Sequence, residues 1–277
     1  MGKAFPRPEL SEATRKNHEA KLAEAENNYR NDSANADNII WLGRRKAYLG
    51  QYDKAIEIFS RGISLHPADA RMYRHRGHRY ITLRCFDAAI ADFKKAGKLT
   101  NGKQDETEPD GLPNAKNIPT STLQSNIWYH LGLAYFVKGG FKKALKAYRE
   151  CLAVSTNNDM YVATANWLYI TLRKLNRLKE ADDLLTTISA DMELVENKDY
   201  HEILMLYKQN IPGEKAMQYL PDKKDLSSAS FGFGAGLYLL SNKKPEEAKK
   251  VFKQILNGNQ WSSFGYIAAE AELKRMK

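Results

Sequence analysis

One spacing recurs along the first part of the chain and limits its fold more than any other feature. Three pairs of identical residues are each 34 residues apart: Gly43 and Gly77, Ala55 and Ala89, and Phe59 and Phe93. A fixed period of this length is typical of repeat architectures, in which each unit leaves an apolar side uncovered until the next unit stacks on it. The sequence therefore predicts an array of stacked units with a cap at each end.

Three segments share one order of small and aromatic residues, and they span 41–67, 73–100 and 128–152. In the third segment the order runs through Trp128, Leu131, Gly132, Tyr135, Gly139, Ala144 and Tyr148. Gly and Ala let two helices approach closely, while the aromatic rings fill the space between consecutive helix pairs. This order resembles the tetratricopeptide repeat (TPR), whose pattern W-x-x-L-G-x-x-Y is followed by Ala and Phe on a second helix and then by Pro. The resemblance implies an all-α fold, a right-handed α-solenoid of helix-turn-helix repeats.

Weaker units follow the third one, each marked by a small residue at the expected helix crossing: Ala181, Ala216 and Ala248. From Ala144 onward the alanines are 37, 35 and 32 residues apart, so the register drifts while the unit persists. The expected organisation is an N-terminal segment with a capping helix in 1–35, two repeats in 36–101, an inserted loop in 102–124, two repeats in 125–195, two degenerate repeats in 196–260 and a C-terminal capping helix in 261–277.

The stretch RMYRHRGHRY, which spans 71–80, combines four arginines and two histidines with a repeat pattern. Tyr73, Gly77 and Tyr80 fall on one face at helical spacing, and this face is expected to pack. The opposite face carries Arg71, Arg74, His75 and His78. The TPR resemblance implies that this opposite face lines a concave groove. Arg76 departs from the repeat pattern, which has Leu at that position.

The resemblance implies a longer set of groove residues across the array. The candidates are Trp41, Arg44, Arg71, Arg74, His75, His78, Asn126, Tyr129, His130, Asn166, Trp167 and His201. Arginine forks bind carboxylates bidentately, and aromatic rings offer flat contact area at a low entropic cost. We therefore expect a non-catalytic interaction scaffold, with no cofactor, that binds an extended acidic peptide or protein segment. For any single candidate, packing on a neighbouring helix or simple solvation is an equal alternative.

An insertion between the second and third units, at 102–122, carries four acidic residues. They are Asp105, Glu106, Glu108 and Asp110. Long loops inside a compact array are usually functional or disordered. One hypothesis is that this acidic loop folds over the basic groove and regulates access to it, and the alternative is a solvated, mobile loop.

The sequence gives little support for catalysis or for metal binding. His75, His78 and His130 suggest a metal-binding or hydrolytic alternative, but zinc needs three or four converging ligands and these residues are spread over neighbouring helices. The segment HEILM at 201–205 lacks the second histidine of the HExxH motif. Cys85 and Cys151 show no CxxC spacing, which argues against a zinc site, a redox motif or a disulfide framework.

The charge of the chain leaves a nucleic-acid-binding alternative open. Lys and Arg total 43 against 33 acidic residues, a formal charge of +10, which favours acidic partners. Interleaved Arg, His, Tyr and Trp can follow a phosphate backbone and stack on bases. However, Lys and Arg often stand beside Glu, as in PEEAKK, which is typical of solvated helix faces. A protein partner is therefore preferred, and an open-ended stack can also self-associate through its end helices.

The sequence contains no segment that predicts a membrane span, because no run approaches ~18 uninterrupted apolar residues. The first ten residues also lack the apolar stretch of a secretory signal. The chain as given is therefore expected in the cytoplasm. If a signal peptide has been removed ahead of it, the expected location becomes the periplasm or the cell envelope.

Overall fold

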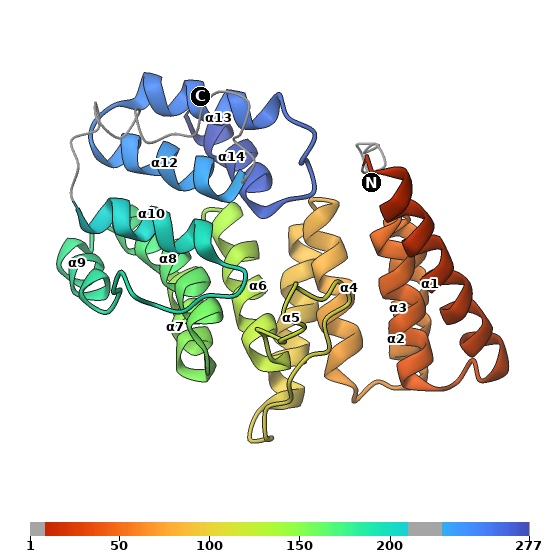
Figure 1. The fold of residues 1–277 in the computed structure, drawn as a ribbon. Helices are drawn as coiled ribbons and strands as arrows, with labels where there is room; N and C mark the ends of the chain where they lie inside the picture. Colours follow the sequence, from red (N-terminus) through yellow and green to blue (C-terminus); the bar gives the residue numbers. More distant parts are fainter. Residues whose placement is uncertain (1–8, 210–228, 277) are drawn as a thin grey trace. The chain divides into compact units, whose positions relative to one another are not determined.

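The computed structural model describes residues 9–209 and 229–276, and Ala216, which marks one of the weaker repeat units, lies outside these ranges. Within them the chain forms thirteen α-helices and no strand, which confirms the predicted all-α helical-repeat fold (Figure 1). The described chain divides into two compact units. The first contains the residues up to Leu112 and Thr122–Leu131, and the second contains Pro113–Ser121 and the residues from Gly132 onward.

The first unit is built from helix pairs that follow one another along the chain. Its helices are α1 (Glu12–Asn31), α2 (Ala36–Tyr48), α3 (Tyr52–Leu65), α4 (Ala70–Thr82), α5 (Phe86–Thr100) and the first part of α6 (Leu123–Val137). Helix α2 packs on α3, α4 packs on α5, and α1 packs on α2. The side chains of Asn35 and Asp69 accept backbone hydrogen bonds at the starts of α2 and α4, which satisfies amide groups that a helix leaves unpaired.

The second unit continues the same construction. Its helices are the remainder of α6, α7 (Phe141–Val154), α8 (Asn158–Lys174), α9 (Leu178–Thr186), α10 (Lys198–Lys208), α12 (Ala229–Ser241), α13 (Pro245–Leu256) and α14 (Phe264–Arg275). Helix α8 packs on α9, α12 packs on α13, and α14 packs on both α12 and α13. Trp261 and Ala268, which lie in the range predicted as the C-terminal capping helix, are buried.

The small residues that recur at the same positions of successive repeats lie at the closest contacts inside the helix pairs. The second-helix alanines are completely buried: Ala55, Ala89, Ala144, Ala181 and Ala248. A Cβ atom added to Gly43 would lie 2.5 Å from the ring of Phe59, and one added to Gly236 would lie 2.3 Å from the ring of Phe252. Small residues are therefore required where the first helix of a pair meets the aromatic ring of the second.

One backbone feature identifies five hairpins, including two that the sequence pattern marks weakly. In each of these pairs, the residue two positions before the start of the second helix has a positive φ angle: Gly50 (71°), Arg84 (62°), Gly139 (80°), Asn176 (56°) and Lys243 (60°). This left-handed conformation suits glycine and strains most other residues. The same turn thus recurs in both units even where its residue is not glycine.

Arg76, the departure from the repeat pattern in α4, has a polar partner on the second helix of its pair. Its Nε and one terminal nitrogen donate to the two carboxylate oxygens of Asp92 at 2.8 and 2.7 Å. The other terminal nitrogen donates to the hydroxyl of Ser60 at 2.9 Å. A bidentate ion pair therefore replaces the apolar contact that leucine makes in the repeat pattern.

Candidate functional site

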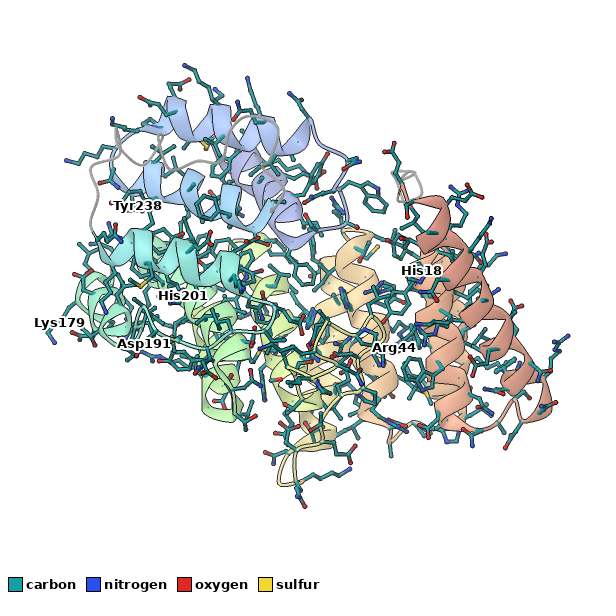
Figure 2. All side chains as sticks on the ribbon, viewed as in Figure 1. His18, Arg44, Lys179, Asp191, His201 and Tyr238 are labelled. Atoms are coloured by element: carbon teal, nitrogen blue, oxygen red, sulfur yellow. The ribbon has the colours of Figure 1, made fainter. Side chains whose placement is uncertain are left out.

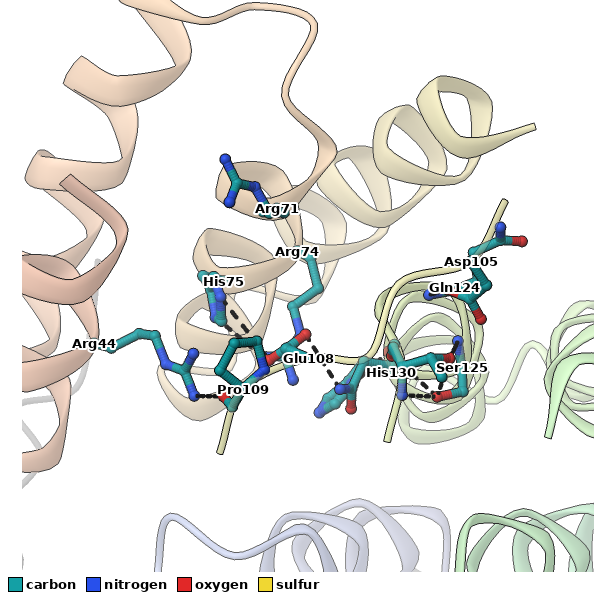
Figure 3. A network of polar contacts seen from close by, with 12 residues as sticks. Arg44, Arg71, Arg74, His75, Asp105, Glu108, Pro109, Gln124, Ser125 and His130 are labelled. Atoms are coloured by element: carbon teal, nitrogen blue, oxygen red, sulfur yellow. Dashed lines mark hydrogen bonds and ion pairs between the residues drawn. The ribbon is translucent and has the colours of Figure 1, made fainter. Parts of the chain in front are cut away.

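The first unit gathers basic and polar side chains from α2, α4 and the start of α6. We call this set the basic surface: Arg44, Arg45, Arg74, His75, Asn126 and His130. Arg44 and Arg74 are only 8% and 7% exposed, which is unusual for arginine. They are covered by residues 108–111 of the inserted loop, which contact the basic surface directly (Figure 3).

Glu108 supplies the carboxylate that balances this charge. Its Oε2 atom lies 2.9 Å from Nε of Arg74 and accepts a hydrogen bond from Nδ2 of Asn126 at 3.2 Å. The Nε2 atom of His75 lies 3.9 Å from Oε1 of Glu108. The Glu108 and Arg74 side chains are 10% and 9% exposed, so the ion pair is largely shielded from water. In such a setting each charge depends on the other, because an unpaired buried ion is strongly destabilising.

Two backbone carbonyls extend the contact beyond the ion pair. A terminal nitrogen of Arg44 donates to the carbonyl oxygen of Pro109 at 2.7 Å, and one of Arg45 donates to that of Gly111 at 2.8 Å. The ring of Trp41 supports both guanidinium groups, whose central carbons lie 4.5 and 4.7 Å from its centroid. The basic surface therefore binds main chain as well as a carboxylate.

Gly111 allows the loop to come this close. A Cβ atom at this position would lie 1.7 Å from the hydroxyl oxygen of Tyr48 and 2.8 Å from a terminal nitrogen of Arg44. Both atoms are side-chain ends on α2, so a side chain at position 111 would require Tyr48, Arg44 or the loop itself to shift. The absence of a side chain here permits the close approach without such a shift.

The base of the loop is fixed separately, at the start of α6. The Oδ1 atom of Asp105 accepts hydrogen bonds from the backbone amides of Glu106 and Gln124 at 2.9 and 3.0 Å. The carbonyl oxygen of Glu106 accepts from the amide of Leu123 at 2.8 Å. Asp105 thus caps the helix, and the side chain of Glu106 is exposed. The acidic residues of the loop consequently have different roles, and Glu108 is the one that contacts Arg74.

The histidines of the basic surface are held in the neutral form. Burial, with a further contribution from the positive charge of Arg74, keeps the pKa of both His75 and His130 well below the ordinary value of 6.5. The Nδ1 atom of His130 lies 2.5 Å from the carbonyl oxygen of Asn126 and therefore carries the proton. The ring of His75 on α4 stacks on Phe59 of α3, and the ring of His130 on α6 stacks on Phe93 of α5, so each histidine packs on the second helix of the preceding pair. They contribute hydrogen-bonding groups rather than charge.

The structure also bears on the metal alternative. The rings of His78 and His130 are close, with centroids 4.6 Å apart. Among the described residues, no group of three or more His, Cys, Asp or Glu side chains is arranged to hold a metal ion.

Two other candidates in the first unit, Arg71 and Tyr129, have partners within that unit. Arg71 forms ion pairs with Asp69 and Asp37, both at 2.6 Å, and is partly exposed. Tyr129 is buried with its ring edge-on to His130. Arg45 and Gly111 were absent from the sequence-based set. In the sequence, Arg45 could have been found from its neighbour Arg44, and Gly111 from the acidic residue Asp110 that precedes it.

The structure corrects the placement of two candidates in the second unit. Trp167 and Asn166 are 0% and 1% exposed, so they do not line an open surface. The ring of Trp167 lies 5.4 Å from those of both Phe136 and Phe233, and these neighbours fill the space that a ligand would need. His201 on α10, labelled in Figure 2, donates a hydrogen bond from its Nε2 atom to the carbonyl oxygen of Ser189 at 2.7 Å. Trp167 and His201 therefore make contacts inside the second unit, whereas both amide atoms of Asn166 are buried without a hydrogen-bond partner among the described residues.

One family model and two known proteins are similar to parts of this chain. The tetratricopeptide repeat model matches residues 125–158. The "BBSome complex member BBS4" of Bos taurus is 26% identical over 137 residues, which cover 50% of this chain and 22% of that protein. "Tetratricopeptide repeat protein 13" of Homo sapiens is 29% identical over 104 residues, which cover 38% of this chain and 10% of that protein. The chain thus corresponds to a minor part of either relative.

A solved structure gives the same picture of the fold. The crystal structure of a tetratricopeptide repeat protein from Parabacteroides merdae has a TM-score of 0.51 and 16% sequence identity, and the match covers 92% of this chain and 94% of that one. At this identity the likeness concerns the fold alone.

In the described part of the chain, no helix combines the length and the apolar character needed to cross a bilayer.

Proposed function

The chain is a tetratricopeptide repeat protein, and from this premise we propose that it is a non-catalytic scaffold whose basic surface binds an acidic segment of a partner protein. The observation that carries the proposal is the buried contact between Arg74 and Glu108. An acidic side chain of the inserted loop is already held there, together with its neighbouring backbone. A partner segment of the same chemistry fits the same groups.

The charge of the surface explains why an acidic occupant is needed. Burial lowers the pKa of Arg74, and the neighbouring Arg44 lowers it further, because two cations close together disfavour each other's charged form. A carboxylate at the position of Glu108 acts in the opposite direction. If the loop left without a replacement, these arginines would turn to water or repel each other. An acidic partner relieves this cost and a basic one increases it.

The loop then acts as a competitor within the same chain. A partner can bind only in the fraction of molecules whose loop has left the surface, so the apparent affinity falls in proportion to that fraction. Loosening the loop should therefore strengthen partner binding without adding a contact to the partner. This is the regulatory role that we propose for residues 102–122.

Affinity capture with full-length baits tests the proposal. The baits are Glu108→Gln, which removes the charge from the buried loop contact, and Glu106→Gln, which removes the same charge from an exposed position in the same loop. We expect proteins with acidic segments to be enriched on the Glu108→Gln bait relative to the Glu106→Gln bait. Adding Arg74→Gln to the first bait should abolish that enrichment.

Two results would count against the proposal. Identical protein sets on the three baits would show that the basic surface does not bind partners. Enrichment that disappears on nuclease treatment, and that falls steeply with added salt, would assign the surface to nucleic acid instead.

A further inference from the structure

The two halves of the inserted loop are held by different contacts. Residues 108–111 contact the basic surface of the first unit, whereas residues 113–121 belong to the second unit and contact Glu196, just before α10. We propose that Glu196 is a positioning residue, which anchors residues 113–121 and thereby sets how strongly residues 108–111 compete with a partner. This inference rests on the proposed function and adds a control of access to it.

The carboxylate of Glu196 joins two points of the loop. Its Oε1 atom accepts a hydrogen bond from the hydroxyl of Thr120 at 2.7 Å and another from Nδ2 of Asn114 at 2.9 Å. Both donors are neutral, and the charge of the acceptor strengthens each bond. The Oδ1 atom of Asn114 also accepts from the backbone amides of Lys116 and Ile118 at 3.1 and 3.2 Å. One carboxylate therefore holds a turn that is closed by its own hydrogen bonds.

The backbone of Glu196 is itself fixed to the start of α8. Asp159 is buried, and its Oδ1 atom accepts hydrogen bonds from the backbone amides of Glu196 and Asn197, both at 2.8 Å. The side chain of Asn157, which caps the same helix, donates to the carbonyl oxygen of Thr120 at 3.0 Å. The Glu196 side chain is exposed and takes no part in the contacts of Asp159. Changing it should therefore release part of the loop without disturbing the start of α8.

The anchor shortens the part of the loop that moves when the basic surface opens. The other end of the loop is fixed at Glu106, whose carbonyl oxygen accepts from the amide of Leu123 at 2.8 Å. With both ends held, the moving part is residues 107–113, and without the anchor it extends to residues 107–121. The entropic cost of closing a loop grows as (3/2)RT ln n, where n is its length in residues. Loss of the anchor should therefore raise the open fraction of the loop by up to about threefold.

Hydrogen exchange in the full-length chain tests the anchor through a double-mutant cycle. Glu196→Ala removes the acceptor, and Thr120→Val removes one donor while keeping a similar shape. Either change should speed the exchange of amides in residues 107–112 by up to about threefold. The double variant should exchange no faster than Glu196→Ala alone, because both changes break the same contact. Glu196→Gln keeps an acceptor oxygen and should give an intermediate rate.

A matched control separates the anchor from general effects on the chain. Glu193→Ala removes an exposed carboxylate from the same connection and should leave the exchange of residues 107–112 unchanged. Amides within α8 should keep wild-type rates in every variant, since the hydrogen bonds of Asp159 to backbone amides remain. Unchanged loop exchange in Glu196→Ala, or fully additive effects in the cycle, would overturn the anchor and leave the proposed function standing.

Partner capture is the second readout, and it tests the control of access. The Glu196→Ala bait should enrich the same proteins as the Glu108→Gln bait, whereas the Glu193→Ala bait should not. Faster loop exchange in Glu196→Ala without this enrichment would overturn the control of access, provided that the Glu108→Gln bait does enrich proteins. If neither bait enriches any protein, the proposed function itself fails.

Discussion

The two units use the first helices of their hairpins in opposite ways. In the first unit these helices present arginine, asparagine and histidine. The carboxylate of Glu108 in the inserted loop pairs with Arg74 and accepts a hydrogen bond from Asn126. In the second unit they present rings that stack on one another: Trp167 on Phe233, and Tyr169 on Tyr207 and then Tyr238. Tyr238 is labelled in Figure 2. One repeat architecture thus carries either a charged surface or a filled apolar one.

The difference determines which unit needs an occupant. Stacked rings bury apolar area and gain from ring contacts without any ligand. A buried arginine needs polar partners, and here Arg74 has the carboxylate of Glu108 while Arg44 has the carbonyl oxygen of Pro109. Arg74 of the first unit therefore needs an acidic group beside it, whereas the stacked rings of the second unit carry no charge that needs a partner. On this ground we propose recognition of an acidic segment for the first unit.

The largest expected effect tests the structural role of the second unit. Trp167→Ala removes a completely buried side chain, and substitutions of this kind cost about 3–5 kcal/mol of unfolding free energy. Urea denaturation followed by circular dichroism measures the loss. Trp41→Ala in the first unit is the matched control, because Trp41 is partly exposed and should cost much less. Equal losses would show that Trp167 is not the core residue we describe.

A pH titration of stability tests the first unit. The folded-state pKa of His75 and of His130 is lowered, so the unfolded chain binds protons first as the pH falls. The full stability is therefore present above pH 6.5, and it decreases below that value, by at most about 1.4 kcal/mol per pH unit for each histidine. Urea denaturation between pH 7.5 and about pH 5 measures the slope. Replacing both residues by Asn should reduce the slope, and the remainder includes the contribution of His78, whose pKa burial also lowers. An unchanged slope would contradict the assignment.

The repeat pattern predicted the hairpins because it records local contacts. Gly43 and Gly236 meet aromatic rings within their own helix pairs, and the second-helix alanines are buried, as the columns required. These contacts join residues less than 20 positions apart, so one period captures them. The strained turn residues Arg84 and Lys243 had no such signal, since their identity does not indicate a positive φ.

The site was harder to predict because it depends on contacts between distant segments. Charge suggested that the loop approaches the arginines, but it did not distinguish Glu108 from Asp105, which caps α6 instead. Trp167 occupies a first-helix position that the TPR resemblance assigns to a groove. Its burial depends on Phe233, which belongs to α12 and lies beyond several weak repeats. A column position alone cannot show which neighbour covers a side chain.

A smaller effect concerns the loop. Glu108→Gln should weaken the local contact by about 1–2 kcal/mol, so the amides of residues 107–112 should exchange with deuterium roughly tenfold faster than in the wild-type chain. Glu106→Gln should leave exchange unchanged, because its side chain is exposed. Amides within α12, in the second unit, should be unaffected by either change. Equal acceleration in both variants would mean that the net charge of the loop, and not the Glu108 contact, holds it in place.

The smallest effect tests whether the two units share the same hairpin turn despite their different surfaces. Lys243 has a φ of 60° and an exposed side chain, and it corresponds to Gly139 in the third hairpin. Lys243→Gly should raise the unfolding free energy by about 0.5–1 kcal/mol, because relief of the left-handed strain exceeds the added flexibility of the unfolded chain. Lys244→Gly is the control: its φ is −115°, so glycine there only adds flexibility and should destabilise the protein. If both substitutions lowered the thermal midpoint alike, the turn of the second unit would not be the strained equivalent of the glycine turn.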